Sequence, residues 1–126
     1  MAKHRPRILI VEDDAIVAKS LCAALGKYNY DVVEPVSSGK EALNALLQHP
    51  VDAVIMDIFI EGSLDGIQTA MRLDPLTACP IIFLTGHTDK HTLARAKSTS
   101  PDGYMVKPFR AEEVHACLQM AISKYQ

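Results

Sequence analysis

The stretch Val54-Ile55-Met56-Asp57 places a carboxylate directly after three apolar residues. A short apolar run between a segment of helical spacing and a glycine-containing loop is typical of a buried parallel strand. The last residue of such a strand emerges at the carboxyl edge of the sheet, where open α/β sheets bind their ligands. Asp57 is therefore the first candidate for a functional residue.

Three further apolar runs, over about residues 7–11, 81–84 and 103–106, are also predicted to be strands that end at polar side chains. The polar residues that follow them are Glu12 and Asp13, then Thr85, then Lys107. Because parallel strands share one carboxyl edge, we expect these side chains to converge on Asp57.

Between the strands, apolar residues recur at helical spacing. Helices are predicted from the N-cap Asp14 to about Gly26, from Ser38 to before Pro50, from Gly66 to before Pro75, over about residues 89–98, and around Val114–Ile122. The residues expected to face the core include Leu47, Met71, Ala94, Met105 and Met120.

A fifth strand is predicted over residues 32–36. It contains Pro35, which has no N–H to donate, so we place this strand at an edge of the sheet. Five strands alternating with five helices predict an α/β domain whose parallel sheet is covered on both faces. The edge position agrees with a flavodoxin-like (βα)5 three-layer sandwich, with its five-stranded parallel sheet in the order 2-1-3-4-5.

Length and composition indicate one small domain. The 126 residues suit a single core, with residues 1–6 as a short basic tail and residues 7–126 as the domain. A net charge of -2 excludes a strong electrostatic attraction to nucleic acid or anionic membranes. Three widely spaced cysteines fit neither a disulfide framework nor a zinc site, and they indicate a reducing, cytoplasmic location. No signal peptide or membrane-spanning stretch is visible.

The strand ends form a chemically coherent group. Glu12, Asp13 and Asp57 would repel one another by up to about 4 kcal/mol per pair at about 4 Å and an effective dielectric of about 20. Lys107 supplies one positive charge, and Mg²⁺ suits the remainder because it prefers carboxylate oxygens and retains water ligands. Asp57 could then act as a nucleophile that forms an acyl phosphate, with Lys107 and the Thr85 hydroxyl contacting the phosphoryl group.

With these residues in place, the chain from about Arg7 to its C-terminus resembles the receiver domain of response regulators in two-component signalling, the CheY-like superfamily. The matching residues are Glu12-Asp13, Asp57, Asp65-Gly66, Thr85, Tyr104 and Lys107-Pro108-Phe109.

The resemblance implies roles for individual residues. Asp57 would accept phosphate from a phosphohistidine, and Asp13 and Asp57 would bind Mg²⁺ directly. The backbone carbonyl of Phe59 would add a metal contact, and Glu12 would act through water. Thr85 and Tyr104 would form a switch pair, and Lys107 would precede a cis peptide bond to Pro108.

The resemblance also implies partners. These are a sensor histidine kinase or a histidine phosphotransfer protein, and a downstream protein that binds the face made by the fourth helix, fifth strand and fifth helix. Lys90, Arg95, Lys97 and Arg110 lie in or near those segments, but a solvated face is the simpler explanation for them. The expectation is a signalling module, not a turnover enzyme, that is a monomer or weak dimer and binds neither nucleic acid nor membrane by itself. It is either a stand-alone receiver or part of a longer regulator or hybrid kinase.

Three positions depart from the commonest pattern of that family. Residues 58–66 form a loop one residue longer than usual, with Glu61-Gly62-Ser63 where many members have proline. Gly86 replaces a common alanine, which we expect to loosen the loop after Thr85. Phe59 cannot orient an attacking water, so we expect slow self-dephosphorylation.

Two other functions are compatible with parts of the pattern. An aspartyl-phosphate phosphohydrolase would need a second acid two residues after Asp57, where this chain has Phe59. A flavodoxin-like electron carrier would need a phosphate-binding loop after the first strand, where three acidic residues stand. His87 and His91 have the i, i+4 spacing of metal ligands but no third ligand nearby, so we assign no metal site to them.

Overall fold

The computed structural model describes residues 5–60, 62–73, 79–86 and 90–124. Its five strands form one parallel sheet in the order β2-β1-β3-β4-β5, as predicted. The strands are β1 (Arg7–Val11), β2 (Asp31–Val32), β3 (Ala53–Asp57), β4 (Ile81–Thr85) and β5 (Gly103–Val106). The helices are α1 (Ala15–Gly26), α2 (Gly39–Gln48), α3 (Gly66–Leu73), α4 (Lys90–Lys97) and α5 (Ala111–Ser123).

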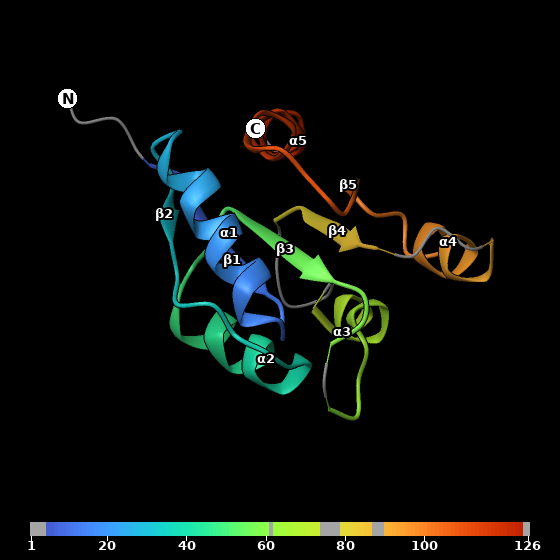
Figure 1. Cartoon of the computed structure of the whole chain (residues 1–126). Helices are drawn as coiled ribbons and strands as arrows, with labels where there is room; N and C mark the ends of the chain where they lie inside the picture. The colour runs from blue at the N-terminus through green and yellow to red at the C-terminus, as the bar shows by residue number, and fades with distance from the viewer. Residues whose placement is uncertain (1–4, 61, 74–78, 87–89, 125–126) are drawn as a thin grey trace.

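The helices cover the sheet as two layers. Figure 1 shows α1 and α5 on one face and α2 and α3 on the other, with α4 at the margin beyond the end of β4. No helix in the described parts of the chain is long and apolar enough to cross a membrane. The fold is the flavodoxin-like three-layer arrangement that the sequence indicates.

The central strand β3 divides two hydrophobic cores. All five of its residues are buried, because β1 and β4 pair with it on both sides and helices cover both faces. Successive side chains of a strand point to opposite faces. Val54 and Met56 accordingly join the core under α2 and α3, whereas Ala53 and Ile55 join the core under α1 and α5.

The second strand is shorter than predicted. Strand β2 covers only two residues at the edge of the sheet, instead of residues 32–36. Beyond it, Val36 forms an isolated bridge with Val11, and its N–H donates to the Ile10 carbonyl over 3.0 Å. Pro35 explains the interruption, because a residue without an N–H cannot continue the ladder.

Helix starts were predicted better than helix faces. Asp14 caps α1 by accepting from the N–H groups of Ile16 and Val17, and the Glu41 N–H donates to the Ser38 hydroxyl at the start of α2. Met105 is buried, as predicted. Four residues assigned to the core are instead exposed, and these are Leu47, Met71, Ala94 and Met120.

The wrong assignments lie beside the buried stripes of their helices. Met71 and Met120 each stand one position from a buried residue, whereas Ala94 lies two positions from both buried residues of α4. In α3 the buried residues are Gly66, Ile67, Thr69, Ala70 and Leu73, and Met71 faces outward. The hydroxyl of Thr69 donates to the Asp65 carbonyl, which lets a polar residue occupy the core.

The start of the chain is partly described. The predicted basic tail covers residues 1–6, of which residues 1–4 lie outside the described part. The Arg5 guanidinium donates to the backbone carbonyl of Tyr30 over 3.0 Å. Arg7, the first residue of β1, forms an ion pair with Asp31 of β2.

Candidate functional site

The ends of β1, β3 and β5 bring four of the predicted side chains together. The register of the strands brings their ends level, because Val11 of β1 pairs with Met56 of β3, and Asp57 lies opposite Leu84 of β4. A hollow of about 280 Å³ opens at this edge. Its lining consists of Glu12, Asp13, Asp14, Asp57, Phe59, Gly86 and Lys107.

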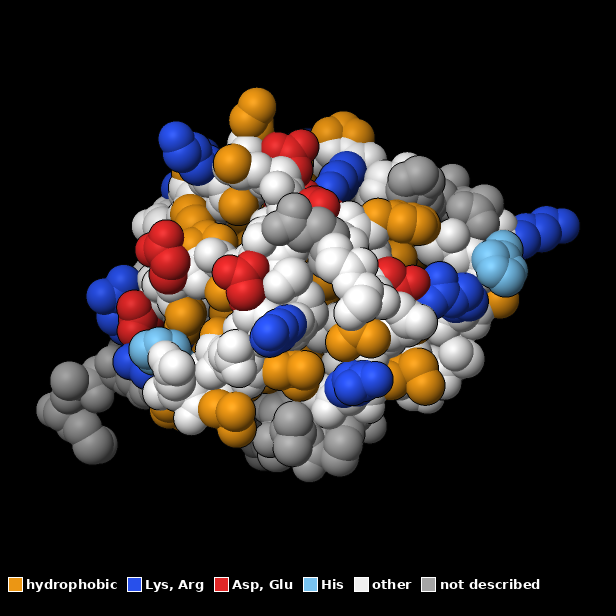
Figure 2. Space-filling view, turned by 90° about the horizontal axis from the view of Figure 1, so that it is seen from below, with side chains coloured by type: hydrophobic (Ala, Val, Ile, Leu, Met, Phe, Trp, Pro, Cys, Tyr) orange, Lys and Arg blue, Asp and Glu red, His pale blue; other side chains and the backbone are white. Residues whose placement is uncertain are grey.

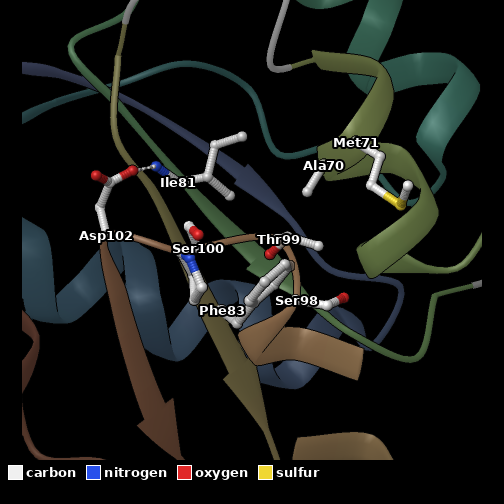
Figure 3. Close-up of a pocket in the computed structure, with 9 residues that line it drawn as sticks. Ala70, Met71, Ile81, Phe83, Ser98, Thr99, Ser100 and Asp102 are labelled. Carbon is white, nitrogen blue, oxygen red and sulfur yellow. Dashed lines mark hydrogen bonds between the residues drawn. The ribbon is translucent and has the colours of Figure 1, made fainter. Parts of the chain in front are cut away.

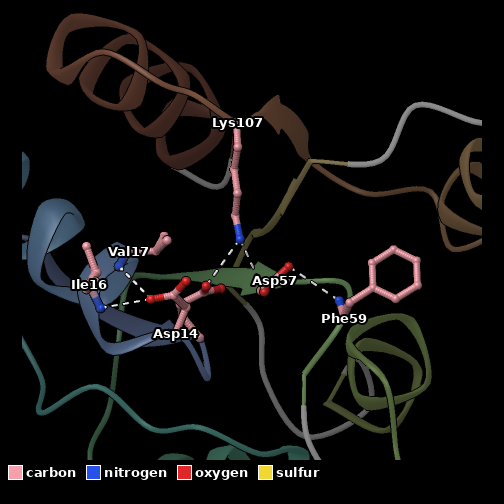
Figure 4. Close-up of polar contacts among 7 residues, drawn as sticks. Asp14, Ile16, Val17, Asp57, Phe59 and Lys107 are labelled. Carbon is pink, nitrogen blue, oxygen red and sulfur yellow. Dashed lines mark hydrogen bonds and ion pairs between the residues drawn. The ribbon is translucent and has the colours of Figure 1, made fainter.

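Lys107 links two buried carboxylates. Its Nζ donates to Glu12 Oε1 over 3.2 Å and to Asp57 Oδ2 over 3.4 Å, and Figure 4 shows the side chain extending from the segment after β5 toward Asp57. The side chains of Glu12 and Asp57 are 1% and 6% exposed, against 26% for Lys107. The two carboxylates are therefore more deeply buried than the lysine that links them.

Glu12 has the most perturbed ionisation in the site. Burial is the main cause, and its hydrogen bond with Asp57 and the Asp57 charge add to it, so that its pKa rises to about 8 although Lys107 acts against the rise. Burial lowers the pKa of Lys107, but the charges of Asp57 and Glu12 outweigh that effect and the net pKa is raised. Lys107 is therefore a stable cation at neutral pH.

The donor set fits a hard divalent cation. Carboxylate oxygens of Glu12, Asp13 and Asp57 lie within 4.8 Å of one another, in a mixture of buried and exposed positions. Glu12 Oε2 is buried and has no hydrogen-bond partner in the described part of the chain. A buried carboxylate oxygen in that state is costly unless a proton, a water or a cation satisfies it. The carboxylates and this oxygen suit Mg²⁺.

Phe59 lies beside Asp57 without covering it. Its backbone N–H donates to Asp57 Oδ1 over 3.3 Å, and Figure 4 shows its ring directed away from Asp57. The two oxygens of Asp57 thus have different partners, a backbone amide on one and Lys107 on the other. These contacts fix the orientation of the carboxylate.

Thr85 and Tyr104 share one face of the sheet. Thr85 ends β4 and is fully buried, and its carbonyl accepts from the Lys107 N–H over 2.8 Å. Tyr104 is half-buried against the core under α2 and α3, and it pairs in register with Phe83. Because Phe83 and Thr85 are two residues apart in one strand, Thr85 and Tyr104 lie on the same side, toward α3 and α4.

The Asp65-Gly66 pair packs against the backbone that carries Asp57. The Gly66 N–H donates to the Ile58 carbonyl over 2.6 Å. A Cβ at Gly66 would collide with the Asp57 carbonyl oxygen and approach Ile58 Cα to 2.7 Å, so a residue without a side chain is required. Sequence reasoning quoted this pair but missed that Arg95 of α4 bonds Asp65 over 2.7 Å, because no local pattern links residues 30 positions apart.

The peptide bond after Lys107 agrees with the resemblance. The Lys107–Pro108 bond is cis, as the resemblance implies.

The basic residues near the predicted output face are mostly exposed. Lys90, Lys97 and Arg110 are exposed, whereas Arg95 is half-buried in its ion pair. Among the described residues, Figure 2 shows acidic, basic and hydrophobic side chains interspersed over one face, without a broad region of one charge. His87, one of the two histidines considered for metal binding, lies outside the described residues.

Comparisons with known proteins agree with this geometry. The family described as response regulator receiver domain matches residues 8–119. The transcriptional regulatory protein PdtaR of Mycobacterium tuberculosis is 30% identical over 120 residues, which cover 95% of this chain and 58% of that protein. An uncharacterized transcriptional regulatory protein of Bacillus subtilis, YrkP, is 34% identical over 94% of this chain and 50% of its own length. The chain thus spans about half the length of these relatives.

Solved structures show the same fold. The signal receiver domain of a modulated diguanylate cyclase from Desulfovibrio desulfuricans G20 is 38% identical, with a TM-score of 0.91 over 97% of both chains. A putative response regulator from Chloroflexus aurantiacus J-10-fl is 30% identical, with a TM-score of 0.88 over 95% of this chain and 99% of that one.

Proposed function

This chain belongs to the response regulator receiver domain family, and from that premise we propose that Asp57 is its phosphoacceptor. The phosphoryl donor is the phosphohistidine of a sensor histidine kinase or of a histidine phosphotransfer protein. One observation carries the proposal, namely that Lys107 Nζ joins the buried carboxylates of Asp57 and Glu12 at an edge where Asp13 lies within reach.

The chemistry follows from the contacts of Asp57. A carboxylate oxygen attacks phosphorus, a P–O bond forms, the P–N bond to the donor histidine breaks, and the imidazole leaves with the bonding electron pair. Lys107 lies close enough to Asp57 to offset charge on the transferred group, and the Phe59 N–H holds the other oxygen. Mg²⁺ bound by Asp13 and Asp57, with Glu12 acting through water and with the Phe59 carbonyl, would neutralise phosphoryl oxygens.

Phosphorylation is then communicated along one face of the sheet. The buried Thr85 hydroxyl moves toward the phosphoryl group, and Tyr104, which is on the same face, turns inward. The output is a changed surface over α4, β5 and α5, which binds a downstream protein. Phe59 offers no polar group to orient water, so the phosphate is long-lived.

The proposal assigns a signalling role without turnover of a separate substrate. A phosphohydrolase would place an acid where Phe59 stands, and a flavin phosphate would be repelled by the acidic residues after β1. We propose that the protein is cytoplasmic, because Cys22, Cys79 and Cys117 are free thiols that suit a reducing compartment. We also propose that it is a monomer or a weak dimer.

Intact mass after incubation with acetyl phosphate tests the assignment. One added phosphoryl group should appear with Mg²⁺ and be absent after chelation and in Asp57→Asn. Asp14→Asn is the matched control, because Asp14 lines the same hollow but caps α1, a role that asparagine preserves. An adduct that persists in Asp57→Asn would refute the assignment, as would its absence from the wild-type protein with Mg²⁺. A half-life of seconds would refute the long-lived phosphate.

A further inference from the structure

Helix α4 has little apolar attachment to the rest of the domain. Of its eight residues only Thr92 and Ala96 are buried, and only Ala96 joins a hydrophobic core. A helix this short gains most of its stability from packing, so another contact must contribute to its position.

The neighbouring α3 does not close against the segment that follows α4. A cavity of about 280 Å³ lies between them. Figure 3 shows Phe83 among the side chains that line it. Its other lining residues are Ala70 and Met71 of α3, Ile81 of β4, and residues 98–102. Side-chain packing between α3 and this segment is therefore incomplete.

An ion pair connects α4 to the residue that caps α3. Arg95 Nη2 donates to Asp65 Oδ2 over 2.7 Å, with the two side chains 35% and 25% exposed. Arg95 stands three residues after Thr92 and next to Ala96, so it projects from the inward side of the helix. Among the ion pairs of the described residues, this one alone involves α4.

Asp65 is itself anchored to the backbone beside Asp57. Its Oδ1 accepts from the Gln68 N–H over 2.8 Å and caps α3, which leaves Oδ2 for Arg95. The next residue, Gly66, donates to the Ile58 carbonyl and packs on the backbone of Asp57. A displacement of that backbone is therefore passed to Arg95 through two adjoining residues.

We propose that the Arg95–Asp65 ion pair is a tether that holds α4 to the loop that follows Asp57, and that it couples the mobility of α4 to the state of Asp57. The first part concerns the unmodified protein and stands by itself. The second part rests on the proposed function, because it requires that Asp57 be phosphorylated. Coupling of this kind is reciprocal, so a weaker tether reduces the response of α4 to Asp57.

Hydrogen exchange in residues 90–97 of the full chain tests the tether. Arg95→Gln and Asp65→Asn should each increase the opening of α4 by about two- to fivefold, the range expected for a partly exposed ion pair. Asparagine preserves the cap of α3, so exchange in Gly66–Leu73 should stay unchanged in that variant. The double variant should open no more than either single variant, since both remove one interaction.

Two controls separate the ion pair from a general effect of charge. Lys97→Gln removes a positive charge from the last turn of the same helix without touching the ion pair, and it should change α4 exchange less than Arg95→Gln does. Raising the salt concentration to about 1 M should loosen α4 in the wild type but not in Arg95→Gln. Equal exchange in the wild type and in Arg95→Gln would overturn the tether.

Phosphorylation with acetyl phosphate and Mg²⁺ tests the coupling. The change in α4 exchange on phosphorylation should be smaller in Arg95→Gln than in the wild type, while both reach the same adduct mass. An equal change in both would overturn the coupling. Absence of an adduct in the wild type would refute the proposed function and the coupling, whereas the exchange of the unmodified variants would still decide the tether.

Discussion

Helices α4 and α5 lie on either side of β5 along the chain, yet they are attached in different ways. Helix α5 buries Val114, Leu118 and Ala121 in the core under α1. His115 stacks on Tyr28 with ring centroids 4.0 Å apart, and its Nδ1 lies 2.9 Å from the Tyr30 hydroxyl.

Helix α4 has two buried residues, an adjacent cavity and one ion pair. The comparison places the site between α5, which is anchored by apolar packing, and α4, which is loosely attached. Elements that move in a switch come from the less stable parts of a protein, because they must be displaced at low cost. Helix α4 satisfies that condition and α5 does not.

The largest expected effect comes from removing an apolar anchor. Leu118→Ala should lower the free energy of unfolding by about 2–5 kcal/mol, because Leu118 is fully buried. Leu93→Ala in α4 is the matched change, and it should cost less than about 1 kcal/mol since Leu93 is only half-buried. Urea unfolding measures both. Equal losses would contradict the contrast between the two helices.

Two glycines show a similar contrast on a smaller scale, because Gly66 at the start of α3 is closely packed and Gly86 after β4 is not. Gly66→Ala should lower the free energy of unfolding by about 1–3 kcal/mol, because its Cβ would meet backbone atoms of Asp57 and Ile58. The matched Gly86→Ala meets nothing within 4 Å. It should be neutral or stabilise by up to about 1 kcal/mol, through the restricted unfolded chain.

Urea unfolding and adduct formation together measure the outcome at the two glycines. Gly66→Ala should also slow the appearance of the acetyl-phosphate adduct, because the backbone of Asp57 must shift. Gly86→Ala should leave it unchanged. A tolerated alanine at position 66 would show that a side chain fits there as easily as at Gly86.

The strand ends were predictable because their signal is local. Each central strand is an uninterrupted apolar run that ends in a polar residue, and the shared edge of a parallel sheet brings Glu12, Asp57 and Lys107 together. The edge position of β2 followed from Pro35 in the same way. The roles of these residues in phosphorylation remain predictions.

Features that depend on tertiary placement were not predictable. Apolar spacing did not show which side of α2 or α3 faces the sheet, so Leu47 and Met71 were assigned to the core. The bond between Arg95 and Asp65 depends on where α4 lies beside α3, and α4 has almost no apolar pattern to place it. The sequence showed an arginine on a helix, for which solvent is the simplest partner.

The last expected effect concerns pH and arises at Glu12, which follows β1. Burial, followed by the hydrogen bond and charge of Asp57, raises the pKa of Glu12 from 4.5 to about 8. Between these values the folded protein holds a proton that the unfolded chain has released. The stabilising contribution of that proton is complete below about pH 4.5 and is lost as the pH rises toward about 8. Lys107 opposes the rise, and the pKa of about 8 already includes its effect.

Urea unfolding of metal-free protein between about pH 5 and pH 8 measures how the free energy of unfolding depends on pH. Glu12→Gln should weaken this pH dependence, because the amide resembles the protonated carboxyl. Hydrogen exchange then relates the pH dependence to the contrast between α4 and α5. Because α5 is anchored by buried residues, we expect its amides to open only with global unfolding, so that their exchange, corrected for the intrinsic rate, follows the same pH dependence. We expect the amides of α4 to open locally and not to follow it. If both helices followed it equally, α4 would belong to the same cooperative unit as α5, and the contrast would fail.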